Sequence, residues 1–286
     1  MLIKLSGLYY GVVSLFFVSL SEENCSKDMS TVLFHEIVFG PIRSRRLGVS
    51  LGVNLLPLDG KWCSYDCIYC ECGYNADNRD DRKIYSREEV RAALHTKLLQ
   101  MQQEGSPLDV ITFAGNGEPT LHPEFEGIID DTIALRNELY PSAHITVLTN
   151  STRLEDEGVF RALCKVDNNC LKLDTMVADT MRLLNVPAGH CDPERVVRAI
   201  EKFEGKCIVQ TMFTRGEHDG KRVDNTTEEE ISLWLDAIAR IRPRQVQIYS
   251  IDRKTPEQRL EKVPVEELQA IGERVKALGI DINVAG

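Results

Sequence analysis

Short apolar stretches alternate with longer amphipathic stretches along most of this chain. The apolar stretches are rich in β-branched residues, which is typical of buried strands. They predict strands over residues 49–57, 109–113, 144–148, 170–173, 206–213 and 245–251, and a last edge strand over 280–284. The amphipathic stretches predict helices over residues 87–103, 123–139, 154–165, 193–203, 227–241 and 265–278.

Three of the predicted helices carry clear start signals. Ser86 precedes a turn with two glutamates, and Thr226 or Thr227 precedes three, as expected for N-caps followed by acidic residues near the positive end of a helix. Asp192 precedes Pro193, which occupies the first helical position, where its missing N–H costs nothing.

The alternation amounts to six β–α units. Helical crossovers between consecutive strands imply a parallel sheet. Polar motifs follow the strand ends, and β–α barrels place their active sites at the carboxyl ends of their strands. We therefore predict an α/β fold with mostly parallel strands, a partial (β/α)6 barrel rather than an open doubly wound sheet.

The first 30 residues differ from the rest. Residues 7–20 are an apolar run, shorter than the roughly 20 residues that span a membrane. The run is similar to a signal-peptide core, but no cleavage site of small residues follows. We favour Met29 as the true start of the protein over the alternative that this run is a genuine membrane anchor. We expect an N-terminal extension over residues 1–30, a core domain over residues 31–286 and no association with membranes.

Composition narrows the functional classes. The chain has 286 residues, 43% of them hydrophobic, and a formal net charge of −10. Binding to nucleic acid without sequence preference depends on Lys and Arg that neutralise phosphates, so the acidic balance disfavours it. The 9 cysteines form no obvious disulfide framework, which indicates a reducing compartment such as the cytoplasm.

The cysteines of one short loop are the strongest chemical signal. Cys63, Cys67 and Cys70 stand at C-x3-C-x2-C spacing, with Cys72 two residues later. Closely spaced thiolates select zinc or iron–sulfur clusters. Structural zinc sites usually need two ligand pairs, and no second pair follows. Three thiolates suit a 4Fe–4S cluster with one open iron, and a fourth ligand at Cys72 would close that iron.

Two polar turns follow the next two predicted strands. Residues 114–121 read AGNGEPTL, in which glycines and a proline surround the single carboxylate of Glu118. Such a tight turn, with exposed carbonyls and a carboxylate, suits a cationic group, although an ordinary βα turn would look similar. Residues 149–152 read TNST, whose hydroxyls and amide suit ribose hydroxyls or a carboxylate; Ser151 and Thr152 suit a helix N-cap equally well.

Polar residues also interrupt the later strands. Lys172 and Asp174 flank one strand, Gln210 lies within the next, and Tyr249, Ser250 and Asp252 end the sixth. Polar side chains in apolar strands must be partnered or lie at the barrel mouth. Before the first strand, Arg43, Arg45 and Arg46 form a basic cluster, either a solvated turn or a site for a substrate phosphate or carboxylate.

The chain resembles the radical SAM superfamily, whose members combine a 4Fe–4S cluster with S-adenosylmethionine. The resemblance covers the chain from about residue 34 and includes Tyr69 before the third cysteine. Within the superfamily, the chain resembles the branch of wybutosine-pathway-like Fe–S oxidoreductases. The motifs that carry this resemblance are GPIRSRRLG (40–48), the cysteine loop, FAGNGEPTLHP (113–123), LTNST (148–152), LKLD (171–174) and YSIDRKTP (249–256).

The resemblance implies roles for these residues. Cys63, Cys67 and Cys70 would ligate one 4Fe–4S cluster. The turn formed by Gly115, Asn116, Gly117, Glu118 and Pro119 would bind the methionine amino group of S-adenosylmethionine. The other expected cofactor or substrate contacts are Asn150, Lys172, Gln210 and Tyr249, with Asp174 as a substrate-side acid or hydrogen-bond acceptor.

Two functional classes remain open. The favoured one is a radical SAM enzyme that forms a 5′-deoxyadenosyl radical and abstracts hydrogen from an unknown substrate, which is a small molecule, a peptide or a tRNA. Its expected partner is an electron donor such as a flavodoxin or ferredoxin. The alternative is a non-catalytic or electron-transfer Fe–S protein that retains the fold. An electron carrier has no need of GNGEP and TNST, so these motifs favour the enzyme.

Overall fold

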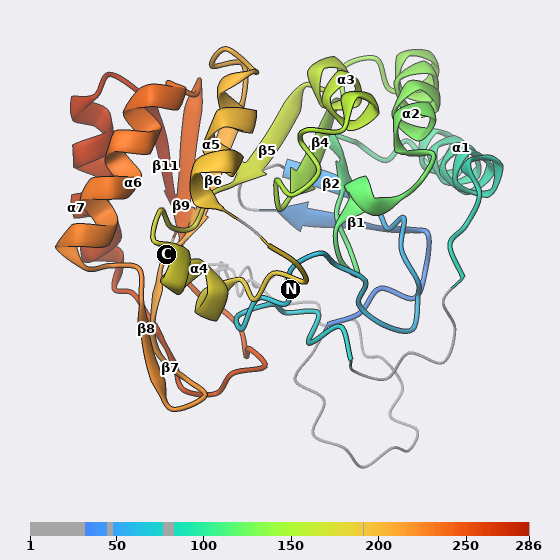
Figure 1. Cartoon of the computed structure of the whole chain (residues 1–286). Helices are drawn as coiled ribbons and strands as arrows, with labels where there is room; N and C mark the ends of the chain where they lie inside the picture. The colour runs from blue at the N-terminus through green and yellow to red at the C-terminus, as the bar shows by residue number, and fades with distance from the viewer. Residues whose placement is uncertain (1–31, 45–47, 77–82, 191, 286) are drawn as a thin grey trace, which may run out of the picture.

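Eight strands form one sheet in this computed structural model, which describes residues 32–44, 48–76, 83–190 and 192–285 (Figure 1). The strands lie side by side in the order in which they occur along the chain. They are β1 (Val38–Ser44), β2 (Gly48–Val53), β3 (Val110–Phe113), β4 (His144–Thr149), β5 (Asn168–Lys172), β6 (Ile208–Met212), β9 (Gln245–Tyr249) and β11 (Asp281–Ala285).

The direction of the strands identifies the architecture. From β2 to β11 every neighbouring pair is parallel, and β1 is antiparallel to β2. A doubly wound sheet would reverse its strand order at a switch point, whereas this order never reverses. Within the described ranges β1 and β11 are the two edges and do not pair with each other. The predicted partial barrel is confirmed, with β11 at the predicted last edge.

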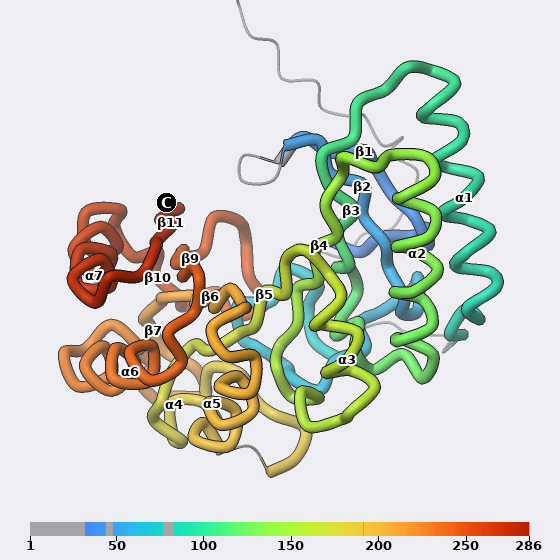
Figure 2. Tube along the Cα trace, turned by 90° about the horizontal axis from the view of Figure 1, so that it is seen from above, coloured from blue at the N-terminus to red at the C-terminus, as the bar shows by residue number. Residues whose placement is uncertain are grey.

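Six crossover helices cover the outside of this curved sheet. Figure 2 shows the strands as an arc, with the helices on its outer side. Three of them begin at the predicted signals, because Ser86 forms a capping box and the side chains of Asp192 and Thr227 accept first-turn backbone hydrogen bonds. The helices are α1 (Arg87–Gln103), α2 (Phe125–Leu139), α3 (Glu157–Lys165), α5 (Pro193–Glu201), α6 (Glu228–Ile241) and α7 (Val265–Ala277).

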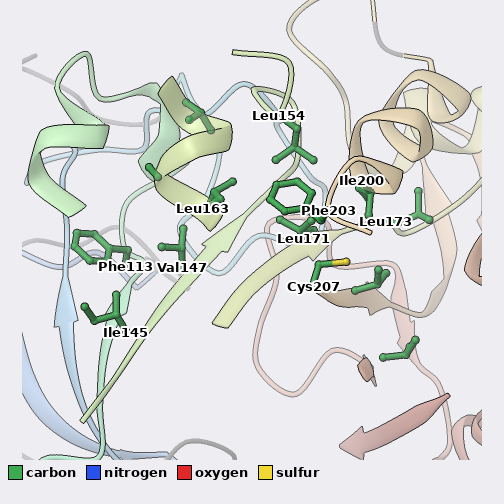
Figure 3. Packing of buried hydrophobic residues seen from close by; sticks show 14 of the residues in the cluster. Phe113, Ile145, Val147, Leu154, Leu163, Leu171, Leu173, Ile200, Phe203 and Cys207 are labelled. Atoms are coloured by element: carbon green, nitrogen blue, oxygen red, sulfur yellow. The ribbon is translucent and has the colours of Figure 1, made fainter. Parts of the chain in front are cut away.

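The two faces of the sheet differ because side chains alternate along a strand. Ile145 and Val147 of β4 join the apolar core with Leu163 of α3 and Phe203 after α5 (Figure 3). The residue between them, Thr146, hydrogen-bonds Asn168 at 3.0 Å on the other face. Similar pairs join Ser50 to Thr112 at 2.9 Å and Gln210 to Gln247 at 2.8 Å. A polar inner layer therefore faces the interior of the partial barrel.

Several elements differ from the predicted ones. The first parallel strand ends at Val53 instead of residue 57, because the Asn54 side chain bonds both the N–H and the carbonyl of Leu56 and turns the chain. Neither β1 nor a small second sheet was predicted, because the alternation of hydrophobic and polar residues is weak in their strands. The strands of the small sheet are polar and partly exposed. The other unpredicted elements are η1 (Pro119–Leu121), α4 (Ala178–Leu184), β7 (Thr214–His218), β8 (Lys221–Asp224) and β10 (Leu260–Lys262).

The predicted N-terminal extension lies outside the described residues, as do Arg45 and Arg46. Among the residues that are described, no helix is both long and apolar enough to cross a membrane.

Candidate functional site

One pocket of about 840 Å³ gathers most of the predicted site residues at the carboxyl ends of the parallel strands. It is lined by Cys63, Cys67, Cys70, Gly115, Gly117, Glu118, Asn150, Lys172, Gln210 and Tyr249, and also by Arg43, Ser250 and Asp252. Three predicted residues do not line it: Asn116, Pro119 and Asp174.

The buried side chain of Lys61 joins two parts of the cysteine loop, and no sequence motif predicted this role. The Lys61 ammonium lies 2.9 Å from an oxygen of Asp66 and 3.0 Å from the carbonyl of Gly73, and its side chain is 1% exposed. Burial alone would lower the pKa of Lys61, but the three neighbouring cysteines and Asp66 raise it above its usual value. A permanent positive charge therefore lies beside the thiols. A single lysine has no spacing pattern that would reveal this.

The thiols of the loop receive hydrogen bonds from several directions. The Cys63 sulfur lies 3.3 Å from the Asn150 side-chain nitrogen and 3.5 Å from the Tyr65 backbone nitrogen. Burial raises the pKa of Cys63 and of Cys67, whereas a hydrogen bond with Cys72 lowers the pKa of Cys70 to about 6. Cys72 itself lies 3.2 Å from the Gly115 carbonyl and does not line the pocket.

The residues present fit an iron–sulfur cluster. Three thiols line one pocket, a buried ammonium offsets their negative charge, and N–H groups point at two of the sulfurs. Among the described residues no three His, Cys, Asp or Glu side chains are grouped as one metal ion would need. A cluster requires no such group, because each thiolate binds a different iron.

The GNGEP turn lies directly against the cysteine loop. Trp62 and Gly117 form a β-bridge, and the Trp62 N–H donates to the Asn116 carbonyl at 2.8 Å. Gly117 has φ +143°, and a Cβ at this position would lie 1.8 Å from the Trp62 carbonyl oxygen. Only glycine therefore allows this close approach.

Asn116 holds this turn in place and does not face the pocket. Its side chain accepts a hydrogen bond from the Phe34 N–H at 2.8 Å and donates to the carbonyls of Phe34 and Pro57 at 2.8 and 2.9 Å. Pro119 begins the short η1 helix and is buried. Of the five residues of the turn, Gly115, Gly117 and Glu118 line the pocket, and their cofactor contacts stay predictions.

Glu118 is a buried carboxylate at the base of the pocket. One oxygen accepts from the Thr149 hydroxyl at 2.7 Å and from Thr120, and the other accepts from the Asn150 N–H at 2.6 Å. Burial raises the pKa of Glu118, while these hydrogen bonds oppose the shift. Glu118 thus ties the end of β4 to the GNGEP turn while it lines the pocket.

Asn150 lines the pocket and bonds residues of the cysteine loop. Its nitrogen lies 2.9 Å from the Ser64 hydroxyl as well as near Cys63, and its oxygen accepts from the Thr152 N–H at 3.1 Å. The expectation that Ser151 or Thr152 caps the next helix is wrong, because Asp156 accepts hydrogen bonds from Gly158 and Val159 at the start of α3.

Asp174, predicted to act on the substrate side, does not line the pocket. Its side chain is fully buried behind Tyr69, whose hydroxyl donates to it. The other carboxylate oxygen accepts from the Met212 N–H at 2.9 Å. Lys172 lies in the pocket wall, with its ammonium 3.0 Å from the Tyr69 hydroxyl and 3.5 Å from Asp174. Asp174 therefore supports residues that line the pocket.

Comparison with protein families gives one match that covers more than half of the chain. The family model described as the Radical SAM superfamily matches residues 59–225. This range includes the cysteine loop, the GNGEP turn and strands β3 to β8.

Two curated relatives and one solved structure show how far the likeness extends. A UPF0026 protein of Synechocystis is 31% identical over 78% of this chain and 78% of its own length. The GTPase Obg of Brachyspira hyodysenteriae is 28% identical over 86% of this chain, which spans 35% of that relative. A radical SAM methyltransferase from Sphaerobacter thermophilus has the same fold, with a TM-score of 0.58 and 16% identity over 82% of this chain and 65% of that chain.

Proposed function

Because the chain belongs to the radical SAM superfamily, we propose that it cleaves S-adenosylmethionine reductively and uses the resulting 5′-deoxyadenosyl radical to abstract hydrogen from a substrate. The observation that carries this proposal is the convergence of three cysteines, Glu118, Asn150 and Lys172 on one pocket. An electron carrier would need the cysteines but not a pocket lined by the other three.

Each group has a distinct task in this proposal. Cys63, Cys67 and Cys70 would hold the single 4Fe–4S cluster, which supplies one electron to break the bond between sulfur and C5′. Glu118 and the carbonyls of the GNGEP turn would accept hydrogen bonds from the amino group of S-adenosylmethionine. The charged Lys172 would attract its carboxylate.

Tyr249 at the end of β9 and the neighbouring Ser250 would border the rest of the cofactor. Gln210 lies on the polar inner layer between Lys172 and Gln247, where it would face either cofactor or substrate. A volume of about 840 Å³ is within the range of pockets that hold cofactor-sized ligands. Arg43 and Arg253 line the same pocket, and Arg253 pairs there with Glu71 at 2.6 Å, so Arg43 would attract an anionic group of the substrate.

We further propose a flavodoxin or ferredoxin as the electron donor and the cytoplasm as the location. The seven cysteines that the structure describes are all free thiols, as expected in a reducing compartment. The substrate class, whether small molecule, peptide or tRNA, stays open.

The test is anaerobic. The purified protein is reconstituted with iron and sulfide, reduced with dithionite and mixed with S-adenosylmethionine, and 5′-deoxyadenosine is measured by mass spectrometry. The proposal expects 5′-deoxyadenosine and methionine from the native chain and none from a triple Ala variant of Cys63, Cys67 and Cys70. A reconstituted, reducible cluster that yields no 5′-deoxyadenosine would favour the electron-transfer alternative.

A further inference from the structure

The segment after α4 lies alongside the cysteine loop. The N–H of Ile68 donates to the carbonyl of Leu184 at 3.1 Å, and the N–H of Asp66 donates to the carbonyl of Asn185 at 3.0 Å. Further along, Tyr65 and Pro187 form an antiparallel bridge. The loop is therefore held between the GNGEP turn on one side and residues 184–188 on the other.

Asn185 directs its side chain into this contact. It is 1% exposed, and its side-chain nitrogen lies 2.7 Å from an Asp174 oxygen, 3.3 Å from the Tyr69 hydroxyl and 3.5 Å from the Cys67 sulfur. A carboxylate oxygen accepts hydrogen bonds, so the amide atom facing Asp174 is the NH2 group. One N–H can bond Asp174 while the second faces Cys67 and Tyr69.

The orientation of this amide is determined by its neighbours. Asp174 is held by the Met212 N–H at 2.9 Å, and Lys172 lies 3.5 Å away from the same carboxylate. Asn185 itself ends α4, and its backbone N–H bonds Met181 at 2.9 Å. Its donor therefore cannot turn away from the sulfur without breaking other buried hydrogen bonds.

We propose that Asn185 is a positioning residue for the cluster of the proposed function: its amide donates to the Cys67 sulfur and raises the reduction potential of the cluster. Hydrogen bonds to cluster sulfurs are among the main determinants of Fe–S potentials, because they stabilise the extra negative charge of the reduced state. Asn185 does not line the pocket, so it acts through Cys67 and not through the bound cofactor.

The size of the effect is limited by the strength of one hydrogen bond, because only the difference in its strength between the reduced and the oxidised cluster shifts the potential. A net contribution of up to about 1.5 kcal/mol corresponds to roughly a tenfold change in an equilibrium constant. At a fixed potential the ratio of oxidised to reduced cluster should rise by up to this factor when the donor is removed. A tenfold change corresponds to about 59 mV for one electron.

The test is an EPR-monitored redox titration of the reconstituted protein without S-adenosylmethionine. Asn185→Leu removes the donor at similar volume, and Asn185→Ser is a smaller second variant in case the first disturbs the loop. Asn169→Leu is the matched control, because Asn169 is also a buried amide, but it lies near the amino end of β5 and donates to the Leu163 carbonyl.

The expected result is a more negative midpoint potential in an Asn185 variant that retains its cluster, with Asn169→Leu unchanged. An unchanged or more positive potential would overturn the inference while leaving the proposed function intact. Loss of the cluster from both Asn185 variants, but not from the control, would also overturn it and make Asn185 a structural support only. Failure of the native chain to assemble a cluster would instead contradict the proposed function.

Discussion

At the scale of single residues, two side chains of the same chemical type have different roles because only one of them lines the pocket. Glu118 and Asp174 are both buried carboxylates near the cysteine loop. Glu118 lines the pocket and bonds the end of β4, whereas Asp174 lies behind Tyr69 and does not line the pocket. Glu118 can therefore meet a ligand directly, and Asp174 can act only through its neighbours.

Replacing Glu118 by Gln should weaken S-adenosylmethionine binding and spare the cluster. A hydrogen bond between charged partners contributes about 1.5–3 kcal/mol, so affinity should fall by roughly one to two decades. The measurement is the change in the EPR signal of the reduced cluster as S-adenosylmethionine is added. Glu230→Gln is the control, because this buried carboxylate bonds Thr175 and does not line the pocket. Equal affinities in both variants would show that Glu118 only supports the turn.

Replacing Cys72 by Ala should leave the cluster in place, whereas Ala at Cys63, Cys67 or Cys70 should remove most of it. Cys72 bonds the Gly115 carbonyl and lies outside the pocket, so it is not expected to reach an iron. Iron and sulfide content, together with visible absorbance after reconstitution, compares the four variants. A cluster lost from Cys72→Ala alone would contradict this ligand assignment.

At the scale of elements, the turns at the strand ends need unusual backbone conformations. Gly115 and Gly117 meet this need in the GNGEP turn, with φ of +147° and +143°. The turn after β4 has Ser151 at φ +71°, in the left-handed region. Its hydroxyl oxygen is buried and has no hydrogen-bond partner among the described residues. This element therefore carries local strain beside the site.

Replacing Ser151 by Gly should stabilise the fold by about 1 kcal/mol. It removes a left-handed strain of about 1–2 kcal/mol and an unpaired buried hydroxyl, offset by about 0.5–1 kcal/mol of extra glycine entropy. Urea unfolding of the cluster-free protein measures the change. Ser151→Ala removes the hydroxyl but keeps the strain, so it should gain less than glycine. A glycine variant less stable than the native chain would contradict this account of the turn.

The contact between α2 and α3 predicts a pH dependence. Arg161 bonds Glu126 at 2.9 and 2.8 Å and lowers the pKa of Glu126 from 4.5 to about 2. A lowered pKa in the folded state stabilises the protein above pH 4.5, and this stabilisation is lost as the pH falls towards 2. The urea midpoint of the native chain should exceed that of Glu126→Gln at pH 7, by an amount that shrinks below pH 4.5. A difference that does not change between pH 7 and pH 3 would rule out this linkage.

At the scale of the whole molecule, the site is assembled from both edges of an open sheet. Ile42 and Arg43 of β1 and residues 283–285 of β11 line the same pocket, although these strands do not pair. Residues near the start of the described chain also support the site. The Val32 N–H donates to the Glu71 carbonyl at 2.7 Å, and Phe34 bonds Asn116.

We predict that removing residues 1–28 leaves the fold and the cluster unchanged. A chain beginning at Met29 retains Val32, Phe34 and every described contact of the site. Iron content and the thermal unfolding midpoint of this shortened chain are compared with those of the full chain. A lower midpoint or a loss of cluster would show that the first 28 residues contribute to the folded domain.

Local patterns were enough to predict much of this protein. Apolar runs of strand length, separated by capped helices, determined the order of the β–α units, because periodicity and caps depend on neighbouring residues. The cysteine spacing and the GNGEP turn indicated the superfamily, because their groups lie close together in sequence. The polar strands β7, β8 and β10 left no such pattern, since little of their surface is buried against the sheet.

Only the tertiary structure decided which polar residues face the pocket. Asp174 and Lys172 are two residues apart in sequence, yet only Lys172 lines the pocket, because the chain leaves β5 between them. Asn185 meets Cys67 across 118 positions, a separation at which no sequence period operates. Lys61 gains its role from burial among thiols. Burial and long-range contact arise from packing the whole chain, so single-sequence patterns could not reveal them.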